Sequence, residues 1–84
     1  MKYFVYILEC ADGTFYIGWT NDLERRLRAH NTLKSGAKYT KTRRPMTLIY
    51  NEAYWTKSKA MKREYALKKL TKAKKMALIK ENGQ

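Results

Sequence analysis

The sequence is poor in cysteine, proline and acidic residues: it has one Cys, one Pro and 7 Asp plus Glu among 84 residues. A lone thiol, Cys10, excludes an internal disulfide, and no Cys and His cluster has zinc-ligand spacing. Cys10 lies in an apolar segment, so we expect it to pack inside a reduced, cytoplasmic protein. No apolar run is long enough to cross a bilayer. Transmembrane and disulfide-rich classes are therefore disfavoured.

The shortage of acid leaves 19 Lys and Arg and a formal net charge of +12. Like charges repel one another in a compact fold and destabilise it. A protein that keeps so many basic residues therefore usually binds a polyanion. A surface that only aids solubility is the alternative, but mixtures of lysine and glutamate achieve that with less imbalance. The basic helices lack the apolar aromatic face of membrane-surface helices. We expect nucleic acid as the partner, no membrane, and one domain over residues 1–84.

Three segments rich in β-branched and aromatic residues predict strands, at about 3–10, 14–19 and 46–55. Asp12-Gly13 separates the first two and is a strong hairpin signal. The third strand, which follows Pro45, should pair with the hairpin. The sequence therefore predicts an α+β fold, in which about three helices flank a three-stranded antiparallel sheet.

Two hairpin registers are open. A two-residue turn at Asp12-Gly13 puts Tyr6 and Tyr16 on opposite faces of the sheet. A three-residue loop with left-handed Gly13 pairs Tyr6 with Gly18 and puts both tyrosines on one face, and glycine at the last loop position favours it. Gly18 inside a strand needs a reason: either another group approaches closely, or the strand ends there in a bulge.

The segment after the hairpin predicts a helix from a cap at Asn21 to about residue 31, with Glu24 three residues past the cap. Leu23 and Leu27 form its apolar stripe. At helical spacing, Arg26 and His30 border that stripe, while Arg25 and Arg28 point to solvent. A lone histidine near an apolar stripe is more often structural. An arginine beside it, facing a sheet that carries tyrosines, makes a functional role a serious alternative.

Residues 32–45 form a basic loop in which a ring and hydroxyl groups alternate with cations. That mixture suits phosphate contacts and base stacking, although a solvated loop is the simpler alternative. The candidate nucleic-acid contacts are Lys38, Tyr39, Thr40, Lys41, Arg43 and Arg44.

Residues 56–80 hold ten basic residues and one acid, Glu64, and predict helices at about 57–69 and, after a cap at Thr71, 72–82. Ala60, Met61 and Leu67 form the expected buried stripe of the first helix, and Glu64 faces inward with them. Burying an unpaired carboxylate costs several kcal/mol, on the order of 3–5. Glu64 should therefore pair with Arg26 or with a lysine, or hold a metal ion.

These residues, taken together, resemble the GIY-YIG nucleases. Phe4-Val5-Tyr6 stands where Gly-Ile-Tyr is usual, and Tyr16-Ile17-Gly18 follows after nine residues. Arg26 lies eight residues past Gly18 and His30 four further, as in the family, and Glu64 matches its glutamate. Trp19 replaces a lysine of some relatives. The family's later asparagine has no assigned equivalent: Met76 stands near its place and Asn82 comes later.

The resemblance implies a metal-dependent endonuclease that hydrolyses DNA phosphodiesters with low sequence specificity, DNA being favoured over RNA. It gives Glu64 one Mg²⁺ or Mn²⁺ ion, and makes Tyr6 or Tyr16 the base that activates water. Arg26 would stabilise charge on the phosphate and His30 would assist. A catalytically weak nucleic-acid-binding module that acts with a partner protein is the alternative.

Overall fold

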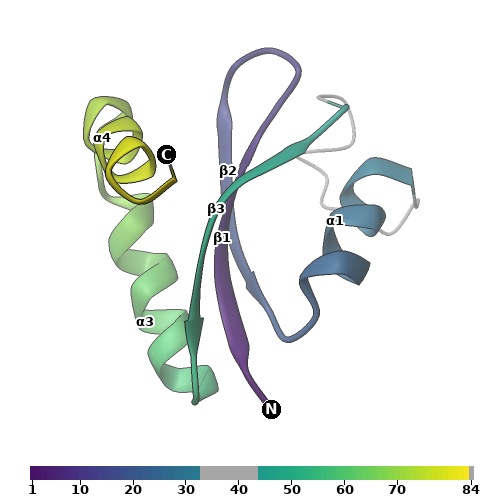
Figure 1. The fold of residues 1–84 in the computed structure, drawn as a ribbon, viewed down its shortest axis with the longest axis vertical. Helices are drawn as coiled ribbons and strands as arrows, with labels where there is room; N and C mark the ends of the chain where they lie inside the picture. The colour runs from purple at the N-terminus through teal and green to yellow at the C-terminus, as the bar shows by residue number, and fades with distance from the viewer. Residues whose placement is uncertain (33–43, 84) are drawn as a thin grey trace.

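The computed structural model describes residues 1–32 and 44–83 (Figure 1). Its order of elements confirms the predicted fold class, an antiparallel three-stranded sheet flanked by helices. Element ends agree with the predicted ones to within a few residues. The elements are β1 Tyr3–Glu9, β2 Phe15–Thr20, α1 Leu23–Thr32, β3 Thr47–Tyr54, α3 Lys57–Lys68 and α4 Lys72–Gly83.

The sheet has the order β2-β1-β3, so β1 is central and antiparallel to both neighbours. Figure 1 shows α1 on one face of the sheet and α3 and α4 on the other. Side chains alternate along β1, as strand geometry requires. Val5 and Ile7 are fully buried in the core beneath α3 and α4, whereas Tyr6 and Leu8 are buried in a second core on the α1 face. The sheet thus separates two small cores.

The β1–β2 hairpin has the three-residue loop. The N–H of Gly13 donates to the carbonyl of Cys10 at 2.9 Å, and the N–H of Cys10 donates to the carbonyl of Thr14 at 2.8 Å. Gly13 has a φ of 84°, which glycine adopts without steric penalty. Tyr6 is consequently paired with Gly18, and both tyrosines lie on the α1 face.

The predicted cap at Asn21 is wrong by one residue, because Asp22 caps α1. Its Oδ1 accepts the N–H of Arg25 at 3.1 Å, and its carbonyl accepts the N–H of Arg26 at 3.0 Å. The reason lies in the preceding residue. The hydroxyl of Thr20 accepts the N–H of Asp22 at 3.1 Å, so the turn that leaves β2 extends one residue further before the helix begins.

The prediction that Met61 is buried is wrong, because its side chain is 45% exposed. Ala60 and Leu67 are completely buried as expected. A helix rotates by about 100° per residue, so Met61 points well away from the line through Ala60 and Leu67. The caps of the two C-terminal helices agree with local sequence: the hydroxyls of Thr56 and Thr71 each accept an N–H three residues later, at 3.2 Å.

Cys10 is a free, buried thiol in the core of the α1 face, as predicted. Among the described residues, no helix has both the length and the apolar character needed to cross a membrane.

Candidate active site

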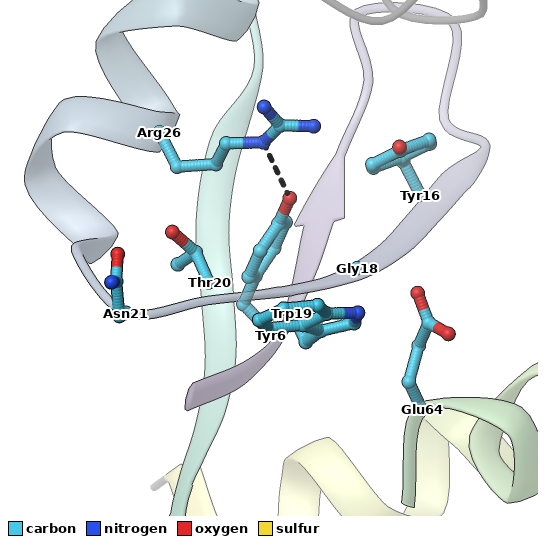
Figure 2. Close-up of a pocket in the computed structure, with 8 residues that line it drawn as sticks. All are labelled: Tyr6, Tyr16, Gly18, Trp19, Thr20, Asn21, Arg26 and Glu64. Carbon is cyan, nitrogen blue, oxygen red and sulfur yellow. Dashed lines mark hydrogen bonds between the residues drawn. The ribbon is translucent and has the colours of Figure 1, made fainter. Parts of the chain in front are cut away.

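An open cleft of about 420 Å³ lies beside β2 and brings together residues from both sides of the sheet. Figure 2 shows Tyr6 and Arg26 on one side of it and Glu64, which projects from α3, on the other. Four of the predicted catalytic and metal-binding residues thus meet in one place. The lining residues are Tyr6, Tyr16, Gly18, Trp19, Thr20, Asn21, Arg26 and Glu64.

Gly18 allows the phenol of Tyr6 to lie directly against β2. A Cβ added at Gly18 would stand 2.5 Å from the hydroxyl oxygen of Tyr6 and 2.8 Å from Cζ. Both distances are far inside van der Waals contact, so any larger residue would displace the ring. Close approach, rather than a bulge, explains a glycine at this position of the strand.

The hydroxyl of Tyr6 connects α1 to the sheet. It lies 3.1 Å from Nε2 of His30 and accepts a hydrogen bond from Nε of Arg26 at 3.4 Å. His30 is completely buried, and its ring meets that of Tyr16 edge-on with 4.9 Å between centroids. His30 therefore lies behind the two phenols and away from the cleft wall.

Burial, together with the guanidinium groups of Arg26 and Arg44, lowers the pKa of His30 to about 4. The imidazole is consequently neutral at pH 7, and in the tautomer that carries its proton on Nδ1, its Nε2 accepts a hydrogen bond from the Tyr6 hydroxyl. Burial also raises the pKa of Tyr6 to about 12, with Arg26 partly offsetting the effect. The hydrogen bond to Tyr6 raises the pKa of Arg26. At neutral pH the cluster is a phenol, a neutral imidazole and a guanidinium.

Glu64 reaches the cleft because of its angular position on α3. At about 100° per residue, Arg63 and Glu64 lie on opposite sides of the buried line formed by Ala60 and Leu67. The Glu64 side chain is 21% exposed, and its Oε2 lies 3.5 Å from Nζ of Lys68. Pairing with a lysine was one of the predicted possibilities; this pair is an i,i+4 contact on a solvated helix face and is worth only about 0.3–0.5 kcal/mol.

On the opposite side of α3, Arg63 binds Glu52 of β3, a contact that the sequence did not reveal. Nε and Nη2 of Arg63 lie 2.8 and 3.1 Å from the two carboxylate oxygens of Glu52. The hydroxyls of Tyr54, at 2.6 Å, and of Tyr50 also donate to Glu52. Burial alone would raise the pKa of Glu52, but these hydrogen bonds hold it below its usual value. The only available signal was the alternation of Tyr50, Glu52 and Tyr54 along a strand.

Comparison with known proteins agrees with this geometry. The model of the GIY-YIG catalytic domain family matches residues 2–77. This chain belongs to the GIY-YIG family. A UPF0213 protein of Syntrophus aciditrophicus is 52% identical over 83 residues, which cover 99% of this chain and 95% of the relative. A UPF0213 protein of Staphylococcus aureus is 53% identical over 80 residues, 95% and 96% of the two chains.

Two solved structures resemble the fold. The solution NMR structure of a UPF0213 protein from Bacillus halodurans has 43% identity and a TM-score of 0.64, covering 99% of this chain and 87% of that chain. A second solution NMR structure, from E. faecalis, has 44% identity and a TM-score of 0.61, covering 93% and 83%.

The donor set of this GIY-YIG cleft fits a hard divalent ion. Among the described residues that line it, Glu64 alone carries a carboxylate, and hydroxyl oxygens of Tyr16 and Thr20 line the same cleft. The described residues contain no group of three or more His, Cys, Asp and Glu side chains placed to hold a metal. Mg²⁺ is commonly held by one or two carboxylates, with water and substrate phosphate completing its shell. Glu64 in an open cleft meets that requirement.

The predicted nucleic-acid contacts of this GIY-YIG chain are only partly visible. Lys38, Tyr39, Thr40, Lys41 and Arg43 lie outside the described residues. Arg44 lies within them, and its Nε donates to the carbonyl of His30 at 2.5 Å and its Nη2 to that of Ala29 at 3.4 Å. These bonds satisfy backbone acceptors near the end of α1, a structural use that the sequence did not predict. Trp19, Thr20 and Asn21 line the cleft and were not predicted as site residues.

Proposed function

We propose that this protein is a metal-dependent endonuclease that hydrolyses DNA phosphodiesters with low sequence specificity. One observation carries the proposal: Tyr6, Tyr16 and Arg26, from the α1 side of the sheet, and Glu64, from α3 on the other side, line one open cleft. Hydrolysis of a phosphodiester needs a group that accepts the proton of the attacking water. It also needs cations near the negative charge that develops on the phosphate oxygens in the transition state. Tyr6 begins the proton route, Arg26 supplies one cation, and Glu64 would hold a second as a metal ion.

Tyr6 and His30 form the proposed proton route. With a pKa of about 12, Tyr6 is ionised in roughly one molecule in 10⁵ at pH 7, so a standing phenolate is too rare to act as base. The hydroxyl of Tyr6 takes the water proton as it passes its own to Nε2 of His30, 3.1 Å away. Because the pKa of His30 is about 4, the imidazole holds this proton only briefly, and the proton returns through Tyr6 to the leaving oxygen. Tyr16 shares the cleft, and its ring packs edge-on against that of His30; in this proposal it orients the water or phosphate.

Arg26 and Glu64 hold the phosphate from opposite sides. The guanidinium of Arg26 donates to Tyr6 through Nε and offers its terminal nitrogens to the phosphate oxygens, whose charge rises in the transition state. Glu64 would hold one Mg²⁺ or Mn²⁺ ion, which, when bound, neutralises phosphate charge and lowers the pKa of water. Exchanging the ion pair with Lys68 for a metal ion would cost little free energy, because this i,i+4 pair is solvated and weak.

The charge of the chain supports the proposed substrate and its low sequence specificity. The net charge of +12 suits the phosphate backbone, and backbone contacts carry no sequence information, which supports low specificity. We propose a single domain over residues 1–84, in the cytoplasm, with DNA as substrate and a partner protein for targeting. The proposed contacts with the DNA strand remain Lys38, Tyr39, Thr40, Lys41 and Arg43.

Cleavage assays test the proposal. Labelled single-stranded, duplex and branched DNA, and RNA, are incubated with the protein with and without Mg²⁺ or Mn²⁺. We expect metal-dependent cleavage that Glu64→Gln and Arg26→Met reduce by at least about 10²-fold, as is typical for one transition-state contact. Glu81→Gln and Arg28→Met change the same charges on exposed helix faces and should retain activity.

The binding-module alternative predicts a different result from the same assays. Glu64 is a lone carboxylate in the described cleft and already has a lysine neighbour, so weak metal binding would leave an inactive scaffold. If wild-type protein binds DNA but cuts none of the substrates with either metal, the hydrolase proposal is wrong and the binding module stands.

A further inference from the structure

The active-site cleft continues into a second hollow of about 580 Å³ along α1. The two hollows share Thr20, Asn21 and Arg26, so Arg26 stands between them and lines both. Pockets that hold small organic ligands typically enclose about 300–1,000 Å³, so each hollow has room for a group the size of a nucleotide. The two hollows therefore adjoin at Arg26, with Glu64 lining the first and Arg25 the second.

The N-terminal half of α1 forms one wall of the second hollow. Asp22, Arg25, Arg26 and Ala29 line it, and their spacing of i, i+3, i+4 and i+7 puts them on one side of the helix. The carboxylate of Asp22 is engaged in capping the helix at the N–H of Arg25. Ala29 is buried, and its small methyl side chain fills little of the hollow.

Arg25 is the exposed cation of this wall. Within the described part of the chain, its guanidinium has no ion-pair partner, in contrast to Arg63. Asn21, with its amide, and Met1, whose side chain is 82% exposed, also line this hollow. A forked cation in the same hollow as an amide and an apolar side chain matches the chemistry of a nucleotide, with its phosphate, polar sugar and flat base.

We propose that the second hollow binds the nucleotide next to the scissile phosphodiester on the same DNA strand, with Arg25 on its phosphate. This inference rests on the proposed function, because the active-site cleft defines which phosphodiester is cut. Arg26 then contacts the scissile phosphate, and Arg25, one residue earlier on α1, contacts its neighbour. The protein should consequently prefer a chain of nucleotides to a single phosphodiester.

Affinity for two probes tests the subsite without relying on catalysis. Binding of thymidine 5′-(p-nitrophenyl phosphate) and of a single-stranded DNA tetranucleotide is measured in EDTA for wild type, Arg25→Ala, Arg25→Lys and Arg28→Ala. Arg28 is the matched control, since it is an exposed arginine of α1 that lines neither hollow. Circular dichroism establishes that each variant is folded.

We expect Arg25→Ala to weaken tetranucleotide binding about tenfold, the value of one charge-assisted hydrogen bond, and to leave the mononucleotide ester unaffected. The slope of log affinity against log salt should fall by about 0.7, because one phosphate contact is lost. Arg25→Lys should retain most of the affinity, and Arg28→Ala should lose less than twofold.

Two results would overturn the subsite. Equal losses for Arg25→Ala and Arg28→Ala would mean that only net charge matters, and an equal loss on the mononucleotide ester would place Arg25 in the catalytic cleft. Failure of the proposed function is recognisable separately. In that case no substrate is cut with any metal, while the Arg25-specific loss of tetranucleotide binding persists.

Discussion

Gly18→Ala tests whether the contact between β2 and Tyr6 organises the site. The new Cβ would lie 2.5 Å from the Tyr6 oxygen, 2.8 Å from Cζ and 3.3 Å from Cε1. Tyr6 is 2% exposed and packs on Leu8, Cys10 and Met46, so the ring has little space into which it can move. To restore contact distance, the phenol must shift by on the order of 1 Å, which breaks its hydrogen bonds to His30 and Arg26.

The expected cost follows from three contributions. Overpacking costs about 1–3 kcal/mol, and each lost hydrogen bond about 1 kcal/mol. Alanine recovers about 0.5–1 kcal/mol because it loses less backbone entropy than glycine in a strand. The net loss is therefore about 2–4 kcal/mol, out of a typical domain stability of about 5–15 kcal/mol. At roughly 4–8 °C per kcal/mol, the melting temperature should fall by more than about 8 °C.

Urea unfolding and thermal melts of wild type, Gly18→Ala, Tyr6→Phe and the double variant measure this cost. Tyr6→Phe removes the oxygen that the new Cβ would meet first, so Gly18→Ala should cost at least about 1 kcal/mol less in that background. Gly13→Ala is the control: its φ of 84° makes alanine strained there, but nothing lies within 4 Å of the added Cβ. Its cost of about 1–2 kcal/mol should be independent of Tyr6. The reasoning is refuted if Gly18→Ala is as stable as wild type, or costs the same with Tyr or Phe at residue 6.

Three further predictions concern the buried histidine, the ion pair of Arg63 on α3 with Glu52 on β3, and a helix cap. With a folded pKa of about 4, His30 should show no NMR titration between pH 8 and 6, and a midpoint near 6.5 would contradict its neutral role. Because the unfolded chain takes up this proton near pH 6.5, the free energy of unfolding should be undiminished above that pH and fall by up to about 3 kcal/mol towards pH 4, a fall that His30→Gln removes. Glu52→Gln should lower the free energy of unfolding, measured in urea, by about 1–2 kcal/mol, because Arg63 and two tyrosines lose a charged acceptor. The control Glu9→Gln, at an exposed residue, should lower it by less than about 0.5 kcal/mol. Equal losses would show that the Arg63–Glu52 ion pair adds no stability. Thr56→Ala should cost about 1 kcal/mol through its lost cap, and no loss would mean that another group satisfies the N–H of Lys59.

The local signals in the sequence were sufficient wherever a residue acts through its near neighbours. Asp12-Gly13 predicted the hairpin and favoured a three-residue loop with a left-handed Gly13. The structure confirms that loop and, with it, the shared face of Tyr6 and Tyr16. Thr56 and Thr71 marked helix starts because capping depends on the next three residues. The assignment of the α1 cap to Asn21 was wrong, because the hydroxyl of Thr20 accepts the N–H of Asp22 and the helix begins one residue later, with Asp22 as its cap.

The sequence by itself determined the α+β fold and predicted the tyrosines, arginine and glutamate that line the cleft, because periodicity and turn chemistry are local and the spacing of these residues follows a family pattern. It only favoured one of two hairpin registers, and the structure confirms that one. Only the tertiary structure decided that Glu64 passes the edge of the sheet to enter the cleft, that Arg63 instead joins Glu52, and that Arg44 binds the end of α1. These contacts join segments far apart along the chain. Their partners depend on how each helix is rotated and packed against the sheet, which no local pattern of residues encodes.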